Sequence, residues 1–415
     1  MPTAQLSEPA LDAGAIRALG ERNDEPAWLR ALRASWWERA ESIPWPTGQE
    51  EEWRRTSLDR LPIEAPVAPE ALSMRCALDP DLADAGVVFA DLAGAVREHP
   101  DLVERYLGRH ETLPSHARFW ALAHAAWSGG TFLYVPAGVS VDRTLIARIR
   151  LDRADVAAFP VTLVVAEEGS SVTLHEEVSS PDGEAGWFGG AVDITAGQGA
   201  RVRYANLQLL GDGAWNIGAQ RVEVGQDAVV TTLNAEVGSR VTKVGLDLRM
   251  AGKGGTSKLL GLLAAGDEQH IDINTVQDLL ASYAVSDLLY LSALYDRARA
   301  GFYGVTKVRP EAKQTSSYQE CRNLLLSPDA GAEPIPVLEI MTNDILRCGH
   351  GATAGAIDPT QMFYAQTRGL DPQAAEQMIV RGFFEQVVAQ IGDETIRERV
   401  LNALARRIGS VEVAA

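Results

Sequence analysis

Hydrophobic and polar residues follow two different patterns along this chain. From Thr131 to about Leu346, short stretches such as VTLVVAEEGSSVTLHEEV alternate apolar and polar positions between glycine-rich turns. Successive side chains of a strand point to opposite faces, so this alternation predicts β-strands. On either side, apolar residues recur every three or four positions, which indicates helices. We therefore expect a helical region over residues 1–130, a β core over 131–357 and a second helical region over 358–415.

Turns of similar composition recur within the β core at a nearly constant interval. EEGSSV begins at Glu167, GQGARV at Gly197, GQDAVV at Gly225 and GKGGTS at Gly252, which gives spacings of 30, 28 and 27 residues. Such a period is typical of a solenoid, in which each coil hydrogen-bonds to the next at about 4.8 Å. A β-solenoid is the prediction, and a β-sandwich with evenly spaced hairpins is the alternative that periodicity leaves open.

The helical regions carry clear start and stop signals. Pro26 opens a first helix, and further helices are predicted over residues 91–107 and 115–127. His116 and His124 on the third helix are separated by about 12 Å of helical rise, so they cannot bind one metal together. We interpret both histidines as structural or surface residues.

The C-terminal region contains two aspartate-proline pairs that predict sharp helix starts. Pro359 is expected to open a short helix and Pro372 a longer one. The adjacent Phe383 and Phe384 give the longer helix a strongly apolar surface. This surface could pack on the solenoid of the same chain or against a partner, and the sequence leaves both open.

Composition excludes several classes of function. The chain has 38 Lys+Arg against 56 Asp+Glu and a net charge of −18, which disfavours nucleic acid as a partner. Its longest apolar runs are about eight residues, whereas roughly 20 are needed to span a bilayer. The first 20 residues lack the pattern of a secretory signal. A cytoplasmic protein that does not span a membrane is expected.

Two motifs for cofactor or metal binding are incomplete. In AGKGGTSK, Gly255 is followed by Thr256 rather than lysine, so the stretch is not a phosphate-binding loop and ATP hydrolysis by this chain is not expected. Three cysteines without CxxC spacing, Cys76, Cys321 and Cys348, cannot build a self-contained tetrathiolate site.

The stretch ILRCGHGATAG, which starts at Ile345, carries the most specific candidate chemistry. Cys348 and His350 are two positions apart, so on a strand they would lie on the same face. They could form a nucleophile and base, contribute two metal ligands, or be structural residues. Two ligands are too few for a closed metal site, so the remaining ligands would have to come from elsewhere in the fold or from a second polypeptide.

Three longer stretches of the sequence resemble those of a known protein family. CRNLLLSPDAGAEPIPVLEI from Cys321, ILRCGHGATAGAIDPTQMFYAQTRG from Ile345 and FLYVPAGVSVDRTL from Phe132 resemble the SufB/SufD family of iron–sulfur cluster assembly proteins. This resemblance implies a right-handed parallel β-helix flanked by N-terminal and C-terminal helical regions, in agreement with the turn period.

Within that family, the SufB type carries a cysteine at the position of Ala330 and a Glu-His-Glu pattern at the positions of Cys348, His350 and Gly351. The replacements here resemble the SufD type. Where the family often has a histidine after the strand INTVQD, this chain has Gln277 and Asp278, which puts any function of that position in doubt. Cys321 is expected to be a buried apolar thiol.

The resemblance implies a non-catalytic subunit that pairs with a SufB-like subunit through the β-helix. A SufC-like ABC ATPase would bind the C-terminal helical region. A nascent iron–sulfur cluster would form transiently at the subunit interface, with His350 and Cys348 as metal-site residues and no cofactor held tightly by the isolated chain, which could also form a homodimer. The alternatives are a SufB-like homodimeric scaffold and a β-helical carbohydrate-active enzyme; the latter would call for paired carboxylates and a secretion signal.

Overall fold

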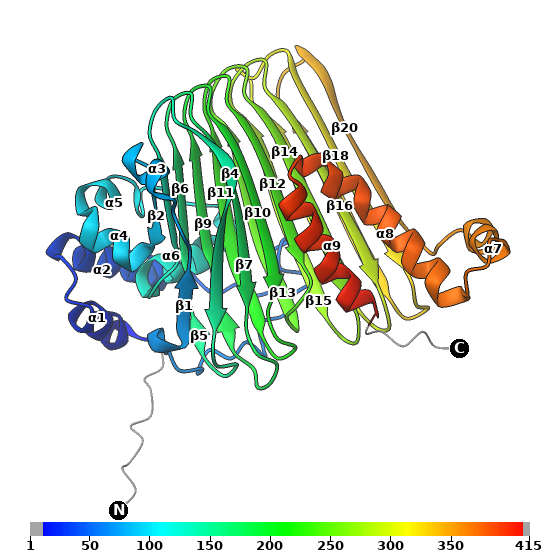
Figure 1. Cartoon of the computed structure of the whole chain (residues 1–415), viewed down its shortest axis with the longest axis horizontal. Helices are drawn as coiled ribbons and strands as arrows, with labels where there is room; N and C mark the ends of the chain where they lie inside the picture. Colours follow the sequence, from blue (N-terminus) through cyan, green and yellow to red (C-terminus); the bar gives the residue numbers. More distant parts are fainter. Residues whose placement is uncertain (1–10, 410–415) are drawn as a thin grey trace, which may run out of the picture.

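A β-solenoid of eight coils forms the centre of the molecule (Figure 1). The computed structural model describes residues 11–409. A nine-stranded sheet has the order β1 (Leu72–Arg75), β4 (Ser140–Leu151), β7 (Ser171–Ser179), β10 (Arg201–Leu209), β12 (Val229–Glu236), β14 (Thr256–Ala265), β16 (Val285–Leu294), β18 (Thr315–Leu325) and β20 (Ile345–Gly355).

An eleven-stranded sheet forms the opposite wall of the solenoid. Its order is β19 (Gly331–Ile340), β17 (Arg299–Val308), β15 (His270–Leu279), β13 (Val241–Met250), β11 (Trp215–Val224), β9 (Ala191–Ala196), β6 (Val161–Ala166), β3 (Thr131–Val135) and β2 (Val88–Asp91), with β5 (Ala157–Ala158) and β8 (Trp187–Phe188) beside it. Apolar side chains from the inner faces of both walls, such as Leu174 and Leu246, are fully buried in one core between them, which we call the lumen.

The turn period predicted from the sequence is confirmed. Gly169, Gly199, Asp227 and Gly254 each have a positive φ at equivalent positions of successive coils. The strands that follow these turns pair in parallel with Ser171 next to Arg201, Arg201 next to Val229 and Val229 next to Thr256. Parallel pairing of strands about 30 residues apart excludes a sandwich built of hairpins, so the solenoid prediction is correct.

The N-terminal helices lie at one end of the solenoid (Figure 1). They are α1 (Ala13–Arg22), α2 (Ala27–Ser42), α3 (Pro80–Asp84), α4 (Leu92–Glu98), α5 (Pro100–Tyr106) and α6 (Ala117–Ala126), with 3₁₀ turns at Pro69–Ala71 and Pro114–His116. The helical block predicted over residues 91–107 is confirmed, and it consists of the two helices α4 and α5. Proline has no backbone N–H to continue a helix, and Pro100 instead occupies the first turn of α5.

His116 and His124 are both buried, so the structural interpretation holds and the surface alternative is wrong. Their exposed fractions are 0% and 2%. Burial lowers the pKa of both imidazoles. His124 Nδ1 lies 2.9 Å from the Trp120 carbonyl oxygen, to which it donates, and its ring packs beside the Trp120 indole.

The C-terminal helices are α7 (Pro359–Thr367), α8 (Pro372–Ile391) and α9 (Glu394–Gly409). Both predicted aspartate-proline starts are confirmed, with Asp358 and Asp371 accepting backbone N–H groups as N-caps. Phe384 is buried among apolar residues of α8, α9 and the outer face of the nine-stranded sheet. The apolar surface of α8 therefore packs on the solenoid of its own chain, whereas α7 projects away from it (Figure 1).

Candidate functional site

Cys348 and His350 lie on β20, the last strand of the nine-stranded sheet. Cys348 pairs with Ser317 of β18 and His350 with Gln319. Side chains of paired residues in parallel strands point the same way, and both β18 partners are buried on the lumen side. The two candidate residues therefore face the mouth of the lumen.

The two side chains have different environments at this position. Cys348 is half-buried and packs against the lumen core, and burial raises the pKa of its thiol. His350 is exposed. Within residues 11–409 no group of three or more His, Cys, Asp or Glu side chains is arranged to hold a metal ion. The described part of the chain therefore supplies a half-site at most.

The glycines on either side of His350 lie against an aromatic ring of the same chain. A Cβ at Gly349 would lie 3.4 Å from the Tyr318 ring, and a Cβ at Gly351 would lie 3.1 Å from its hydroxyl. Arg347 covers the same ring, with its guanidinium carbon 4.2 Å from the ring centroid. The strand CGHG thus lets Tyr318 and Arg347 pack flat against the outer face of the last coil.

Other residues of the predicted motifs have structural partners. Cys321 is buried, as predicted, and burial raises the pKa of its thiol to about 12. Gln277 Nε2 donates to Ser286 Oγ at 2.7 Å inside the lumen. Asp278 forms an ion pair with Arg309 at 2.7 Å on the outside of the solenoid. Ala330 is buried in the turn before β19.

The coil that carries the candidate residues has no neighbour on its outer side. β19 and β20 are the terminal strands of their sheets within the described chain, and none of the residues from Gly331 to Gly355 is buried. A strand edge with free N–H and C=O groups readily pairs with another chain. This end of the solenoid, which we call the open end, can therefore accept a partner's strands.

Three apolar side chains at the open end were not singled out from the sequence. Ile340 ends β19 and Met341 follows it, and they are 42% and 47% exposed; Leu346 on β20 is 68% exposed. Leu346 lies at a register shift between β18 and β20, where Thr315 pairs with Ile345 but Ser316 pairs with Arg347. The extra residue forms a β-bulge. The local sequence does not indicate this bulge, because a bulge is defined by pairing with another strand, and β18 lies about 30 residues earlier.

Comparison with known proteins identifies the family. Residues 149–383 match the family described as "SUF system FeS cluster assembly, SufBD core domain", and residues 75–146 match "SufBD protein N-terminal region". The core match covers more than half of the chain. The chain belongs to the SufBD family.

Relatives of this SufBD protein include both types of subunit. Iron-sulfur cluster assembly protein SufD of Bacillus subtilis is 26% identical over 96% of this chain and 98% of its own length. Iron-sulfur cluster assembly protein SufB of the same organism is 28% identical over 76% of this chain and 67% of its own length. A SufBD family protein of Staphylococcus saprophyticus is 28% identical over 76% of this chain and 67% of its own length.

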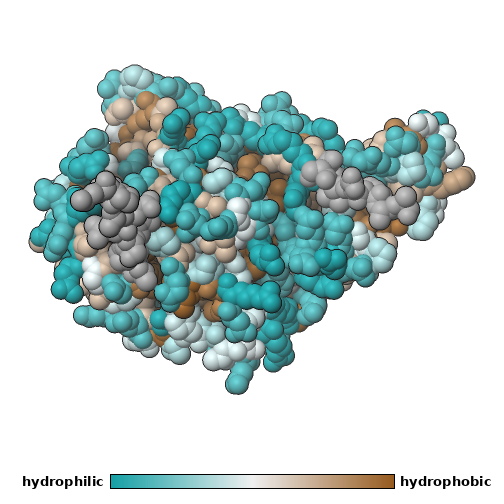
Figure 2. Space-filling model, turned by 90° about the horizontal axis from the view of Figure 1, so that it is seen from below, coloured by the Kyte–Doolittle hydropathy of each residue, from teal (hydrophilic) through white to brown (hydrophobic). Residues whose placement is uncertain are grey.

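A second apolar surface of this SufBD protein lies at the projecting end of the C-terminal helices. Phe363 and Tyr364 of α7 are 68% and 60% exposed, and Met378 of α8 is 51% exposed. Figure 2 shows hydrophobic side chains on this projection. A cavity of about 310 Å³ beside it is lined by residues of α8 and α9, among them Met378 and Leu401. None of the helices within residues 11–409 is long and apolar enough to cross a membrane.

Proposed function

We propose that this chain is a SufD-like, non-catalytic subunit of a cytoplasmic iron–sulfur cluster assembly complex. Residues 131–357 form the part that pairs with a SufB-like subunit, and residues 358–415 form the arm that binds a SufC-like ATPase. Residues 1–130 form the N-terminal helical region, whose described part, from residue 11, closes the opposite end of the solenoid. The full-length similarity to a SufD protein supports the assignment to this type.

The features of the open end are the main support for this proposal. It combines two free strand edges, exposed apolar side chains at Ile340, Met341 and Leu346, and the pair Cys348 and His350 at the mouth of the lumen. A SufB-like β-helix that continued the sheets would satisfy the edge hydrogen bonds and cover the apolar side chains.

The chemistry of Cys348 and His350 fits an iron-binding site shared between two subunits. A nascent cluster is the cargo of the complex, so its irons need ligands that can both bind and release. The exposed imidazole of His350 is a suitable iron ligand or proton carrier, and the thiol of Cys348 is a softer ligand close by. The partner supplies the remaining ligands, because the described part of this chain holds no third candidate ligand near the pair.

The exposed aromatic residues of α7 fit the ATPase arm. Phe363 and Tyr364 belong to a short helix that projects from the solenoid, and α8 connects it directly to the nine-stranded sheet. Aromatic anchors on a projecting element are typical of an interface core. Movement of the ATPase would reach the coils of the solenoid through the buried face of α8.

The test is anaerobic co-purification with the SufB-like and SufC-like partners. Iron and acid-labile sulfide are measured per complex for the wild type, for His350→Ala and for the matched control His99→Ala. His99 is an exposed histidine between α4 and α5 in the N-terminal region. We expect His350→Ala to assemble normally but to lose most of its iron and sulfide, and His99→Ala to resemble the wild type.

Unchanged cluster content in an assembled His350→Ala complex would contradict a role of His350 in the site. Failure of the wild-type chain to co-purify with the SufB-like subunit, together with a stable homodimer that builds clusters alone, would favour the SufB-like scaffold instead. The absence of a cysteine at Ala330 argues against that outcome.

A further inference from the structure

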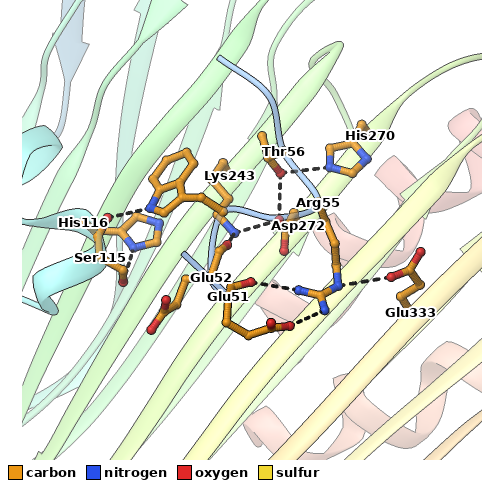
Figure 3. A network of polar contacts seen from close by, with 11 residues as sticks. Glu51, Glu52, Arg55, Thr56, Ser115, His116, Lys243, His270, Asp272 and Glu333 are labelled. Atoms are coloured by element: carbon orange, nitrogen blue, oxygen red, sulfur yellow. Dashed lines mark hydrogen bonds and ion pairs between the residues drawn. The ribbon is translucent and has the colours of Figure 1, made fainter. Parts of the chain in front are cut away.

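A cavity of about 550 Å³ lies on the outside of the eleven-stranded sheet, away from Cys348 and His350. It opens where the segment 51–56, which arrives from the N-terminal region, crosses β15, β17 and β19 (Figure 3). Its volume is within the range of about 300–1,000 Å³ that is usual for small-molecule sites. The cavity is lined by Arg54, Arg55, His270, Arg299, Ala300, Gly301, Gly331, Ala332 and Glu333.

A buried ion pair fixes the segment that forms one wall of this cavity. Lys243 and Asp272 are both fully buried, and their Nζ and Oδ2 atoms are 2.7 Å apart. Lys243 also donates to the Glu52 carbonyl oxygen, and Thr56 Oγ1 donates to Asp272 Oδ2 at 2.7 Å. These bonds hold the backbone of the segment on the sheet, so that Arg55 is placed rigidly at the cavity wall.

The same bonds determine which nitrogen of His270 carries the proton. The single hydroxyl proton of Thr56 is donated to Asp272, so Thr56 Oγ1 must accept from His270 Nε2, which lies 2.9 Å away. Burial lowers the pKa of His270, which keeps the imidazole neutral at pH 7. His270 Nδ1 then has a free lone pair and no partner among residues 11–409. It is an acceptor available to a ligand.

Arg299 supplies positive charge without a counter-charge. It pairs directly with His270 across β15 and β17, so the two side chains leave the sheet side by side. Arg55 is neutralised by Glu51 and Glu333, at 2.6 and 3.2 Å. Arg299 donates Nη1 to the Asp329 carbonyl oxygen, and no carboxylate among residues 11–409 lies within ion-pairing distance of it. Its Nε and Nη2 groups stay available.

Two glycines keep the floor of the cavity open. A Cβ at Gly331 would lie 2.9 Å from Arg299 Nη1, and a Cβ at Gly301 would lie 2.9 Å from Asp272 Oδ1. Asp272 Oδ1 is buried and has no hydrogen-bond partner within residues 11–409. Any larger residue at these two positions would displace Arg299 or fill the hollow.

We propose that this cavity is a binding site for a small phosphate-type anion that still carries a protonated oxygen. Arg299 provides charge-assisted hydrogen bonds to the anion, and His270 Nδ1 accepts a hydrogen bond from the protonated oxygen. Monohydrogen phosphate has this combination near pH 7, and a phosphate ester has it in its minor, singly protonated form, because the second pKa of the ester is about 6. Sulfate has the charge but no proton to donate.

The test is calorimetric titration of the full-length chain with inorganic phosphate and, separately, with sulfate at the same ionic strength. We expect saturable binding of phosphate at one site and clearly weaker binding of sulfate. Arg299→Gln should weaken phosphate binding at least about tenfold, because the loss of a charge-assisted hydrogen bond has an effect of this order. The matched control is Arg201→Gln, an exposed arginine on β10 of the other sheet, and it should bind phosphate like the wild type.

Gly331→Val offers an independent test that leaves every charge in place. Its side chain would enter the space of the Arg299 guanidinium and displace it, so phosphate binding should weaken while circular dichroism stays unchanged. The proposal is overturned if phosphate and sulfate bind equally, if Arg299→Gln and Arg201→Gln have the same effect, or if the wild-type chain shows no saturable phosphate binding. A phosphate ester that binds more tightly than phosphate would identify the ester class as the ligand.

Discussion

The two ends of the solenoid differ in whether a further strand of the chain covers the last coil. At the N-terminal end, β2 pairs with β3 and β1 pairs with β4, both antiparallel, so each sheet is extended by a strand that runs against it. Four of the five residues of β3 are buried. At the open end, β19 and β20 have no such strand in the described chain and no buried residue.

The two ends of the solenoid differ in their contributions to stability and to function. Each coil is stabilised by its two neighbours, so an end coil needs a cap or a partner. The described N-terminal region, residues 11–130, closes one end, whereas the other end, with its cysteine and histidine, has no covering strand within the described chain. In the proposed complex, the capped end supports the fold and the open end supports assembly.

The largest expected effect comes from breaking the link between the N-terminal region and the sheet. Lys243→Met leaves the carboxylate of Asp272 buried without its partner, which should lower the free energy of unfolding by about 3–5 kcal/mol. The free energies of unfolding of the variant and the wild type are measured by urea denaturation. The double variant Lys243→Met/Asp272→Leu removes the uncompensated charge and should recover part of the loss; a double variant as unstable as the single one would contradict the explanation.

A matched pair of leucines compares the two ends directly. Leu133 on β3 is fully buried, whereas Leu338 on β19 is half-buried, and both face the lumen. Leu133→Ala should cost about 2–5 kcal/mol and Leu338→Ala distinctly less, since less apolar surface is lost from the core. Addition of the SufB-like partner should increase the loss of stability caused by Leu338→Ala and leave that of Leu133→Ala unchanged. Equal costs in the isolated chain would remove the distinction between a capped and an open end.

The smallest effect on stability is expected for a change at the bulge. Leu346→Glu places a charge on an exposed apolar position of the open end, so folding should be unaffected within about 0.5 kcal/mol. Affinity for the SufB-like subunit should fall about tenfold, as measured by surface plasmon resonance, because a buried charge at an interface is unfavourable. The control Ile63→Glu, an exposed position of the N-terminal region, should leave affinity unchanged.

The repeating features of this fold could be predicted from the sequence, and the contacts between distant segments could not. The turns at Gly169, Gly199, Asp227 and Gly254 recur at a nearly constant interval. Each contains a residue with a positive φ, a conformation that glycine adopts most easily, so the repeated turns can be recognised in the sequence. The Lys243 to Glu52 contact joins residues 191 positions apart, and no periodic pattern records such a pairing.

The candidate site could be predicted only in part, because contacts between distant segments leave no pattern in the local sequence. The spacing of Cys348 and His350 is local, and it places both on one side of a strand. The free edges beside them depend on which coil is the last, and the role of Tyr318 behind Gly349 and Gly351 depends on a neighbouring coil. The helical block over residues 91–107 could be predicted from its local apolar pattern, and Pro100 divides it into α4 and α5.

Hydrogen–deuterium exchange of the full-length chain, alone and with the SufB-like subunit, tests whether the open end is the assembly interface. The backbone amides of β19 and β20 at the free edges should exchange fast in the isolated chain and become protected in the complex, whereas those of β2 and β3 should be equally protected in both. Protection that appears elsewhere on the chain, with β19 and β20 unchanged by the partner, would contradict assembly through the open end.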